Sequence, residues 1–326
     1  MKKVKALGLF SGGLDSLLAS LLLKEQGIKI FWVTFVSPFF NNYEKCKKFS
    51  KIFKIPLKKI DFTKKFLKML INPKYGYGSV MNPCMDCHIL MLKEAKKYAK
   101  KIKADFIFTG EVLGERPFTQ QEKQLKIIEK EAGLEKKILR PLSAKLLPLT
   151  EAEEKGLVDR EKLYAIKGRR RIFQIELAKK FGLKEYPTPG GGCILTQKEF
   201  VAKLIDLITF NKKITEKDIQ LLKIGRHFRF GKNKIIVGRN EKENKILEKM
   251  KGIKLNVPNY GSPTTLLQGK FNKEALIIAA RLTARYSDCK EEKILVEWKT
   301  GKRKGELIVN PISEEEKEKL RIKWLK

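Results

Sequence analysis

Apolar and polar positions along the first 145 residues follow the rhythm of strands that alternate with helices. Apolar runs predict strands at residues 4–10, 29–36, 57–61, 105–109 and 138–142. Apolar residues at helical spacing predict one helix from Leu14, another that carries Leu90 and Leu92, and others at 43–53, 63–71 and 121–132. This alternation is typical of an α/β domain with a doubly wound parallel sheet, in which ligands bind at the carboxyl ends of the strands.

The pattern changes after residue 146. Residues 151–181 read as an acidic and basic helical stretch, and further helices are expected at 198–210, 216–224, 241–251 and 273–286. Short strands are expected at 227–230 and 234–237, and residues 299–304 resemble a hairpin tip. The sequence therefore predicts three parts: an α/β domain at 1–145, a helical or linker region at 146–224, and a smaller basic α/β or α+β domain at 225–326.

A glycine turn joins the first predicted strand to the first predicted helix. Gly12 and Gly13 allow the backbone to approach phosphate oxygens closely, and Ser11 and Ser16 add hydroxyl groups. The unpaired N–H groups of a helix start also bind anions, so we expect a nucleotide-binding loop. The alternative is a capped turn, because serine and aspartate favour helix starts in any case. No Gly-Lys-Ser/Thr follows the glycines, so the loop is not of the Walker type.

The charge of the chain predicts a class of partner. The chain of 326 residues holds 71 Lys and Arg against 37 Asp and Glu, a formal net charge of +34 that attracts polyanions. The three consecutive arginines Arg169, Arg170 and Arg171 reinforce this prediction of nucleic-acid binding. Adaptation to heat also enriches lysine, but it normally raises glutamate alongside. No apolar run is long enough to cross a bilayer, and we expect a cytoplasmic protein without membrane association.

Three of the five cysteines stand at positions where they can act together. Cys84 and Cys87 form a Cys-x-x-Cys pair before a helix whose N-terminus favours thiolates, and Cys193 follows three glycines. Together they would make a three-thiolate site for a metal or cluster. We expect no functional role for Cys46 and Cys289. Neither of the two histidines has a recognisable acid or base partner in the sequence.

The sequence Ser-Gly-Gly-Leu-Asp-Ser at 11–16 resembles the PP-loop of the ATP pyrophosphatase superfamily. The resemblance implies that ATP is cleaved between its α- and β-phosphates, that Asp15 helps to hold Mg²⁺, and that Ser11, Gly12, Gly13 and Ser16 hold pyrophosphate. At the end of a later predicted strand, Thr109, Gly110 and Arg116 are candidates for phosphate contacts. Arg116 could equally be a surface cation.

The order of the PP-loop, an Asn-Pro-x-x-x-Cys element and a later Gly-x-Cys turn resembles the tRNA thiouridine synthases, above all the 2-thiouridylases. Cys87 and Cys193 match that family's two cysteine positions. The additional Cys84 resembles the iron–sulfur tRNA thiolases, in which three cysteines hold a 4Fe–4S cluster with one iron open. The resemblance implies an ATP-dependent sulfurtransferase that adenylates a uridine carbonyl of tRNA and replaces its oxygen with sulfur, with Asp15, Cys87 and Cys193 as catalytic residues.

The last hundred residues carry a second resemblance. Residues 236–240, Ile-Val-Gly-Arg-Asn, with Glu243 and Asn244 following, resemble the RNA-binding domain of ribosome-associated quality-control factors. Arg226, Arg229 and Arg239 are the expected phosphate contacts there. The alternative is a structural domain with solvated basic residues.

Three functions remain open at this stage. The first is the tRNA sulfurtransferase, which would take its sulfur from sulfide, a carrier protein or a desulfurase and could be oligomeric. The second is another PP-loop ligase that acts on a small molecule, by amidation or thio-cofactor synthesis. The third is a non-enzymatic RNA-binding protein with structural zinc, which would need a fourth ligand, and only His88 is close in the sequence.

Overall fold

The computed structural model describes residues 3–183, 192–211, 213–301 and 303–324. The chain divides into two compact units, Met1–Thr196 and Gln197–Lys326. The three parts expected from the sequence remain a prediction, and residues 146–224 contribute to both units. No helix within the described ranges is long and apolar enough to span a membrane.

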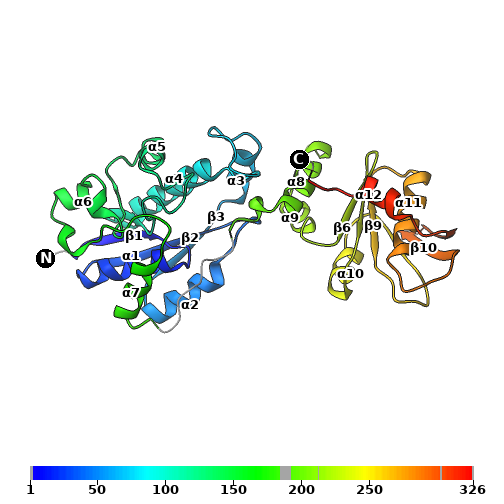
Figure 1. Ribbon diagram of the computed structural model, residues 1–326, viewed down its shortest axis with the longest axis horizontal. Coiled ribbons are helices and arrows are strands. Elements are labelled where there is room, and N and C mark those ends of the chain that lie inside the picture. Colours follow the sequence, from blue (N-terminus) through cyan, green and yellow to red (C-terminus); the bar gives the residue numbers. More distant parts are fainter. Residues whose placement is uncertain (1–2, 184–191, 212, 302, 325–326) are drawn as a thin grey trace. The chain divides into compact units, whose positions relative to one another are not determined.

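The first unit is built on a five-stranded parallel sheet with the strand order β3-β2-β1-β4-β5. Its strands are β1 (Lys5–Leu9), β2 (Lys29–Val36), β3 (Leu57–Asp61), β4 (Phe106–Thr109) and β5 (Ile138–Leu139). Its helices are α1 (Leu14–Glu25), α2 (Tyr43–Phe53), α3 (Thr63–Ile71), α4 (Cys84–Ile102), α5 (Glu122–Ala132), α6 (Glu151–Glu154) and α7 (Ile172–Lys180). Helices α1, α2 and α7 lie on one face of the sheet and α3, α4 and α5 on the other (Figure 1). The predicted doubly wound α/β fold is confirmed.

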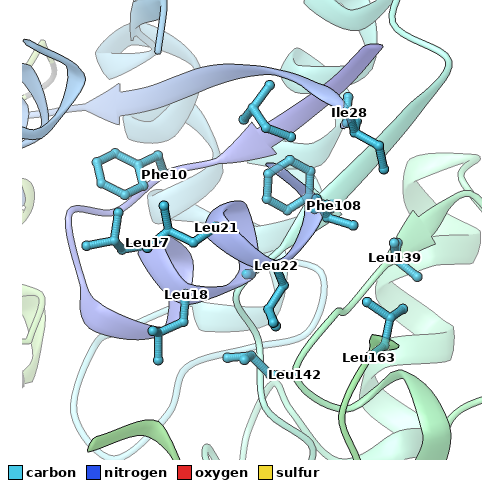
Figure 2. Packing of buried hydrophobic residues seen from close by; sticks show 14 of the residues in the cluster. Phe10, Leu17, Leu18, Leu21, Leu22, Ile28, Phe108, Leu139, Leu142 and Leu163 are labelled. Atoms are coloured by element: carbon cyan, nitrogen blue, oxygen red, sulfur yellow. The ribbon is translucent and has the colours of Figure 1, made fainter. Parts of the chain in front are cut away.

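Helix α1 is fixed within the core because its apolar residues are not confined to one side. Ten of its twelve residues are buried, as expected of a helix that is covered on both sides. Leu17, Leu18, Leu21 and Leu22 pack into the cluster that includes Phe10 and Phe108 (Figure 2). Leu177 and Ala178 of α7 belong to the same cluster. The loop that precedes α1 therefore starts from a well-anchored helix.

The predicted helical stretch at 151–181 was wrong as a continuous element. Helix α6 is only four residues long, and α7 begins eighteen positions later. Gly156 and Gly168 have φ of +65° and +88°, conformations that interrupt a helix. The intervening segment contains a short 3-10 helix at Arg160–Lys162 and packs Leu163 and Ile166 into the core. Several other predicted elements match the structure within two or three residues.

The second unit is built on a six-stranded antiparallel sheet with the order β11-β10-β8-β9-β7-β6. Its strands are β6 (Arg226–Phe230), β7 (Asn233–Val237), β8 (Ile253–Asn256), β9 (Thr265–Gln268), β10 (Ile294–Thr300) and β11 (Arg303–Val309). Its helices are α8 (Lys198–Phe210), α9 (Glu216–Leu221), α10 (Glu241–Glu248), α11 (Lys273–Arg285) and α12 (Glu314–Leu320). Ala275, Ala279 and Leu282 of α11 pack on the apolar face of the sheet. The predicted hairpin joins β10 to β11, where Thr300 pairs with Arg303.

Candidate nucleotide and thiolate site

The loop at residues 11–13 presents backbone N–H groups at the carboxyl end of β1. Gly12 has a φ of +75°, which favours glycine, and a Cβ there would lie 3.2 Å from Cys46 Sγ. Gly13 precedes α1 and supplies no side-chain cap, so the first-turn N–H groups remain available. Ser16 Oγ donates to Gly13 O at 2.9 Å, and Ser11 Oγ accepts from Gly13 N at 3.2 Å. This arrangement suits a phosphate group.

Gly110 has a separate steric reason to be glycine. A Cβ at this position would lie 2.4 Å from the backbone nitrogen of Ser16. The end of β4 therefore packs directly on the start of α1, and any side chain would push the two apart. Thr109 and Gly110 thus lie beside the phosphate-binding loop, although they are 93 and 94 residues beyond Ser16 in the sequence.

A cavity of about 430 Å³ joins this loop to two of the cysteines. It is lined by backbone and side chains from the ends of β1, β2 and β4 and from the start of α4. The predicted site residues in its wall are Ser11, Gly12, Gly13, Asp15, Ser16, Cys84, Thr109, Gly110, Arg116, Arg171 and Cys193. A cavity of this size suits a mononucleotide.

Two carboxylates and one arginine form the charged part of the cavity. Arg171 Nη2 lies 2.8 Å from Asp15 Oδ2 and 3.4 Å from Glu115 Oε1. Burial raises the pKa of Asp15, and burial together with the Asp15 charge raises the pKa of Glu115. Asp15 Oδ1 is buried without a hydrogen-bond partner among the described residues. A spare carboxylate oxygen beside a second carboxylate is the kind of oxygen ligand that Mg²⁺ prefers.

The run of three arginines is divided by this arrangement. Arg169 and Arg170 are exposed, whereas the Arg171 side chain is 21% exposed and points at the carboxylates. All three were predicted to contact RNA because they are consecutive in the sequence. Their separation follows from the start of α7, where Arg171 is the N-cap residue.

A buried ion-pair network on the cavity wall was not predicted. Glu111 Oε2 accepts hydrogen bonds from Arg140 Nε at 3.0 Å and Thr109 Oγ1 at 2.9 Å, and Glu111 Oε1 lies 3.1 Å from His88 Nδ1. Arg140, 3% exposed, also pairs with Glu129. Burial would raise the pKa of Glu111, but Arg140 and the hydrogen bonds outweigh it and lower the pKa to about 2. His88 thus has an acidic partner, 23 residues away, which only the fold reveals.

The three predicted metal-binding cysteines come from α4 and from the segment before α8. Cys84 and Cys193 line the cavity, and Cys87 lies one turn along α4 from Cys84. The Cys193 segment is held by backbone hydrogen bonds from Ile194 N to Phe39 O and from Met81 N to Leu195 O, both 3.3 Å. All three thiols are half-buried.

The protonation of these thiols differs from the expectation based on the helix start. Burial raises the pKa of Cys87 well above its ordinary range, and repulsion from Cys193 and Cys84 adds to the effect. Burial also raises the pKa of Cys193 to about 11. Without a cation these two groups are therefore thiols at neutral pH.

The geometry does not favour a single zinc ion. Within the described part of the chain, no three His, Cys, Asp or Glu side chains are placed to hold one metal ion. His88, the nearest additional ligand in the sequence, is oriented by Glu111. In a 4Fe–4S cluster each cysteine binds a different iron, so the ligands stand further apart than around one ion.

The arginines predicted to bind RNA in the second unit have partners within that unit. Arg229 forms a two-pronged ion pair with Asp206, at 2.8 and 2.6 Å, and lies 4.0 Å from the Phe210 ring centre. Arg239 pairs with Glu243. Arg226 stacks over Tyr286 at 4.5 Å. These contacts give each side chain a structural role.

The parallel sheet and the glycine loop without a Walker lysine define a PP-loop nucleotide-binding domain. Residues 2–145 match the family model of the thiamine biosynthesis protein ThiI. Residues 225–321 match the model of the NFACT protein RNA-binding domain. The chain therefore combines a ThiI-type PP-loop domain with an NFACT-type RNA-binding domain.

Three solved structures illustrate the wider similarity. One is described as a predicted subunit of a tRNA methyltransferase from Methanocaldococcus jannaschii, with 17% identity over 57% of this chain and 93% of that one and a TM-score of 0.33. A 4-thiouridine synthetase in complex with RNA and ATP shows 22% identity over 54% and 50%, with a TM-score of 0.35. The U34-tRNA thiolase NcsA from Methanococcus maripaludis, with its 4Fe–4S cluster, shows 17% identity over 77% and 74%, with a TM-score of 0.32. No curated protein matches the chain by sequence.

Proposed function

We propose that this protein is an ATP-dependent tRNA sulfurtransferase that adenylates a uridine carbonyl and replaces its oxygen with sulfur. One observation carries the proposal: a single cavity brings a PP-loop, a carboxylate pair and two of the three cysteines together. The PP-loop suits the adenylation step and the cysteines suit the delivery of sulfur. Because both groups of residues line the same space, the adenylated carbonyl need not leave the cavity before sulfur attacks.

Adenylation would use residues at the start of α1. The N–H groups of residues 13–16 with Ser11 and Ser16 would bind the departing pyrophosphate. Asp15 and Glu115 would hold Mg²⁺, which neutralises phosphate charge when bound. Arg171 already lies between these carboxylates and can neutralise charge on the phosphates as they separate.

Cys84, Cys87 and Cys193 would hold a 4Fe–4S cluster, which supplies an open iron position for hydrosulfide when bound. The raised pKa values of Cys87 and Cys193 suit ligands that lose their protons only when metal binds. A competing mechanism uses Cys193 as a persulfide and Cys87 to release the sulfur through a disulfide, and leaves Cys84 without a role.

The second unit and the net charge favour tRNA over a small molecule as the substrate. The NFACT-type domain supplies an RNA-binding module, and a charge of +34 exceeds what a small-molecule ligase needs. The family description of the first unit also names thiamine biosynthesis, so synthesis of a thio-cofactor is the second candidate. Action on tRNA would place the protein in the cytoplasm.

Mass spectrometry of tRNA nucleosides from a deletion strain tests this function. We expect one thionucleoside to disappear, to return with the wild-type gene, and to stay absent with the Asp15→Asn variant. Its identity would show whether O2 or O4 is replaced. Purified protein should convert ATP to AMP and pyrophosphate in the presence of tRNA. An unchanged set of thionucleosides, or ADP and phosphate as products, would contradict the proposal.

A further inference from the structure

We infer that Phe118 and Phe173 form a stacking platform beside the nucleotide cavity and that this platform receives an unpaired nucleotide of the RNA substrate. The inference rests on the proposed function for its choice of RNA, and it adds the surface by which the target strand is recognised. Large aromatic side chains that remain exposed usually mark a binding surface when they are grouped with other binding groups. Phe118 is 52% exposed and Phe173 is 64% exposed.

Both phenylalanines are close in the sequence to residues that line the cavity. Arg116 and Thr119 line the cavity, and Phe118 lies between them in the sequence. Arg171 also lines the cavity, and Phe173 follows it by two residues in the first turn of α7. Each phenylalanine therefore lies within two residues of an arginine that lines the cavity.

The two segments that carry the rings are held together. Gly168 N donates to Leu113 O at 2.8 Å, and Leu113 forms a bridge with Lys167. Arg171 Nη2 adds an ion pair to Glu115 at 3.4 Å. The loop after β4 and the segment before α7 thus form one surface, although they are more than fifty residues apart in the sequence.

The charges around this surface differ from those of the second unit. Arg169 and Arg170 are exposed and form no ion pair with a carboxylate in the described ranges, whereas the exposed Arg116 lies within electrostatic range of Asp15 and Glu115. Arg229 and Arg239 of the second unit are both occupied by carboxylates. Unpaired arginines beside exposed aromatic rings match the two needs of an RNA strand, charge for phosphates and flat faces for bases.

The size of the cavity indicates that the nucleotide must be unpaired. A space of about 430 Å³ accommodates a nucleotide but not a double helix. Enzymes that act on one base therefore take it out of the stack, and proteins stack unpaired bases on aromatic side chains. Phe118 and Phe173 would offer the extruded uridine or its neighbour a replacement for the lost stacking.

The test compares Phe118→Ala and Phe173→Ala with Leu149→Ala in the full-length protein. Leu149 is a suitable control because it is an apolar residue of the same unit, is 47% exposed and does not line the cavity. Binding of an unmodified tRNA transcript is measured by fluorescence anisotropy at several salt concentrations. Each platform variant should weaken binding roughly 5- to 150-fold, the equivalent of about 1–3 kcal/mol per stacked base. The Leu149 variant should stay within about twofold of wild type.

Salt dependence separates stacking from charge. Loss of a ring should leave the slope of log affinity against log salt unchanged, whereas Arg169→Gln should flatten it by about 0.7 to 0.9. Affinity for ATP should not change in the phenylalanine variants. Photo-cross-linking of a 5-bromouridine transcript should label peptides that contain Phe118 or Phe173.

Wild-type RNA affinity in both platform variants, with cross-links confined to the second unit, would overturn the inference. So would retained RNA binding with selective loss of binding to a protein that donates sulfur, because the surface would then belong to a protein partner. Cross-links at the platform in a protein that makes no thiouridine would instead overturn the proposed function and leave this inference standing.

Discussion

Replacement of Asp15 by Asn should remove Mg²⁺-dependent ATP binding without unfolding the first unit. Burial raises the pKa of Asp15, so its ionised form is less favourable in the folded protein than in water. The stability linked to this group is present at low pH and is lost as the pH rises through the folded pKa. At neutral pH the buried charge therefore costs stability, and a neutral side chain relieves that cost.

The magnitudes decide the expected shift in melting temperature. The lost attraction to Arg171, at a separation of 2.8 Å, is about 6 kcal/mol at an effective dielectric constant of about 20. The desolvation penalty that disappears with the charge is larger than this attraction, because burial raises the pKa of Asp15 by more than Arg171 lowers it. Asp15→Asn should thus melt at the wild-type temperature or up to a few degrees above it. In contrast, Mg²⁺ and ATP at a hundred times the Kd stabilise the wild type by about 2.7 kcal/mol, which raises Tm by roughly 5–10 °C.

Differential scanning fluorimetry with and without Mg²⁺ and ATP measures both effects. Asp159→Asn is the control, because Asp159 lies in the same unit outside the cavity wall. It should keep the full ligand-induced shift, and Asp15→Asn should lose it. A persistent shift in Asp15→Asn would show that Asp15 is only part of the helix start. A fall in Tm of ten degrees without ligand would show that the Arg171 pair outweighs the burial penalty.

Three further predictions concern the cysteines, the buried network and the arginine run. Protein purified without oxygen should be brown and contain iron and sulfide. The Cys84→Ala variant should lose both the cluster and thiolation activity, and the control variant Cys289→Ala should keep both. A colourless protein that still thiolates tRNA after Cys84→Ala would favour the persulfide mechanism. The pKa of Glu111 is about 2 in the folded protein, against an ordinary value of 4.5. Its ionised form therefore adds about 3 kcal/mol to the free energy of unfolding above pH 4.5, and this stability is lost as the pH falls towards 2. Acid unfolding of Glu111→Gln should therefore depend less steeply on pH than that of wild type, and identical curves would contradict the assignment. Arg171→Gln should change ATP affinity and Arg169→Gln only RNA affinity; equal effects of both on RNA would mean that the run acts as one patch.

The parallel-sheet domain was predictable because each of its elements carries a local signal. Apolar runs marked the strands, and the helix boundaries of α2 and α3 coincide with the predicted ones. The second sheet was only partly predictable. Strands β8 and β9 are four residues each and pair with each other across an eight-residue connection, so neither a long apolar run nor a tight turn marks them in the sequence.

The candidate site shows the same division between local and distant information. The PP-loop and the cysteine pair are contiguous motifs, and the sequence identified them as candidates. The pairing of His88 with Glu111 and of Arg171 with Asp15 depends on contacts across 23 and 156 residues. Glu111 and Glu115 lie two and six residues beyond the end of β4, in a loop whose position could have marked them as site residues. Their partners could not be found without the fold.

The contact between Asp15 and Arg171 has a consequence for how the protein is made. The first residue of the pair emerges early from the ribosome, and the second only after the whole sheet and six helices of the first unit have been synthesised. Until then Asp15 lacks its counter-ion, and the face of α1 that packs with Leu177 and Ala178 lacks its cover. A nascent chain that ends near residue 145 would thus hold the complete loop motif and still lack a finished nucleotide site. ATP can assist the folding of this unit only during the last stage of its synthesis, once α7 has docked.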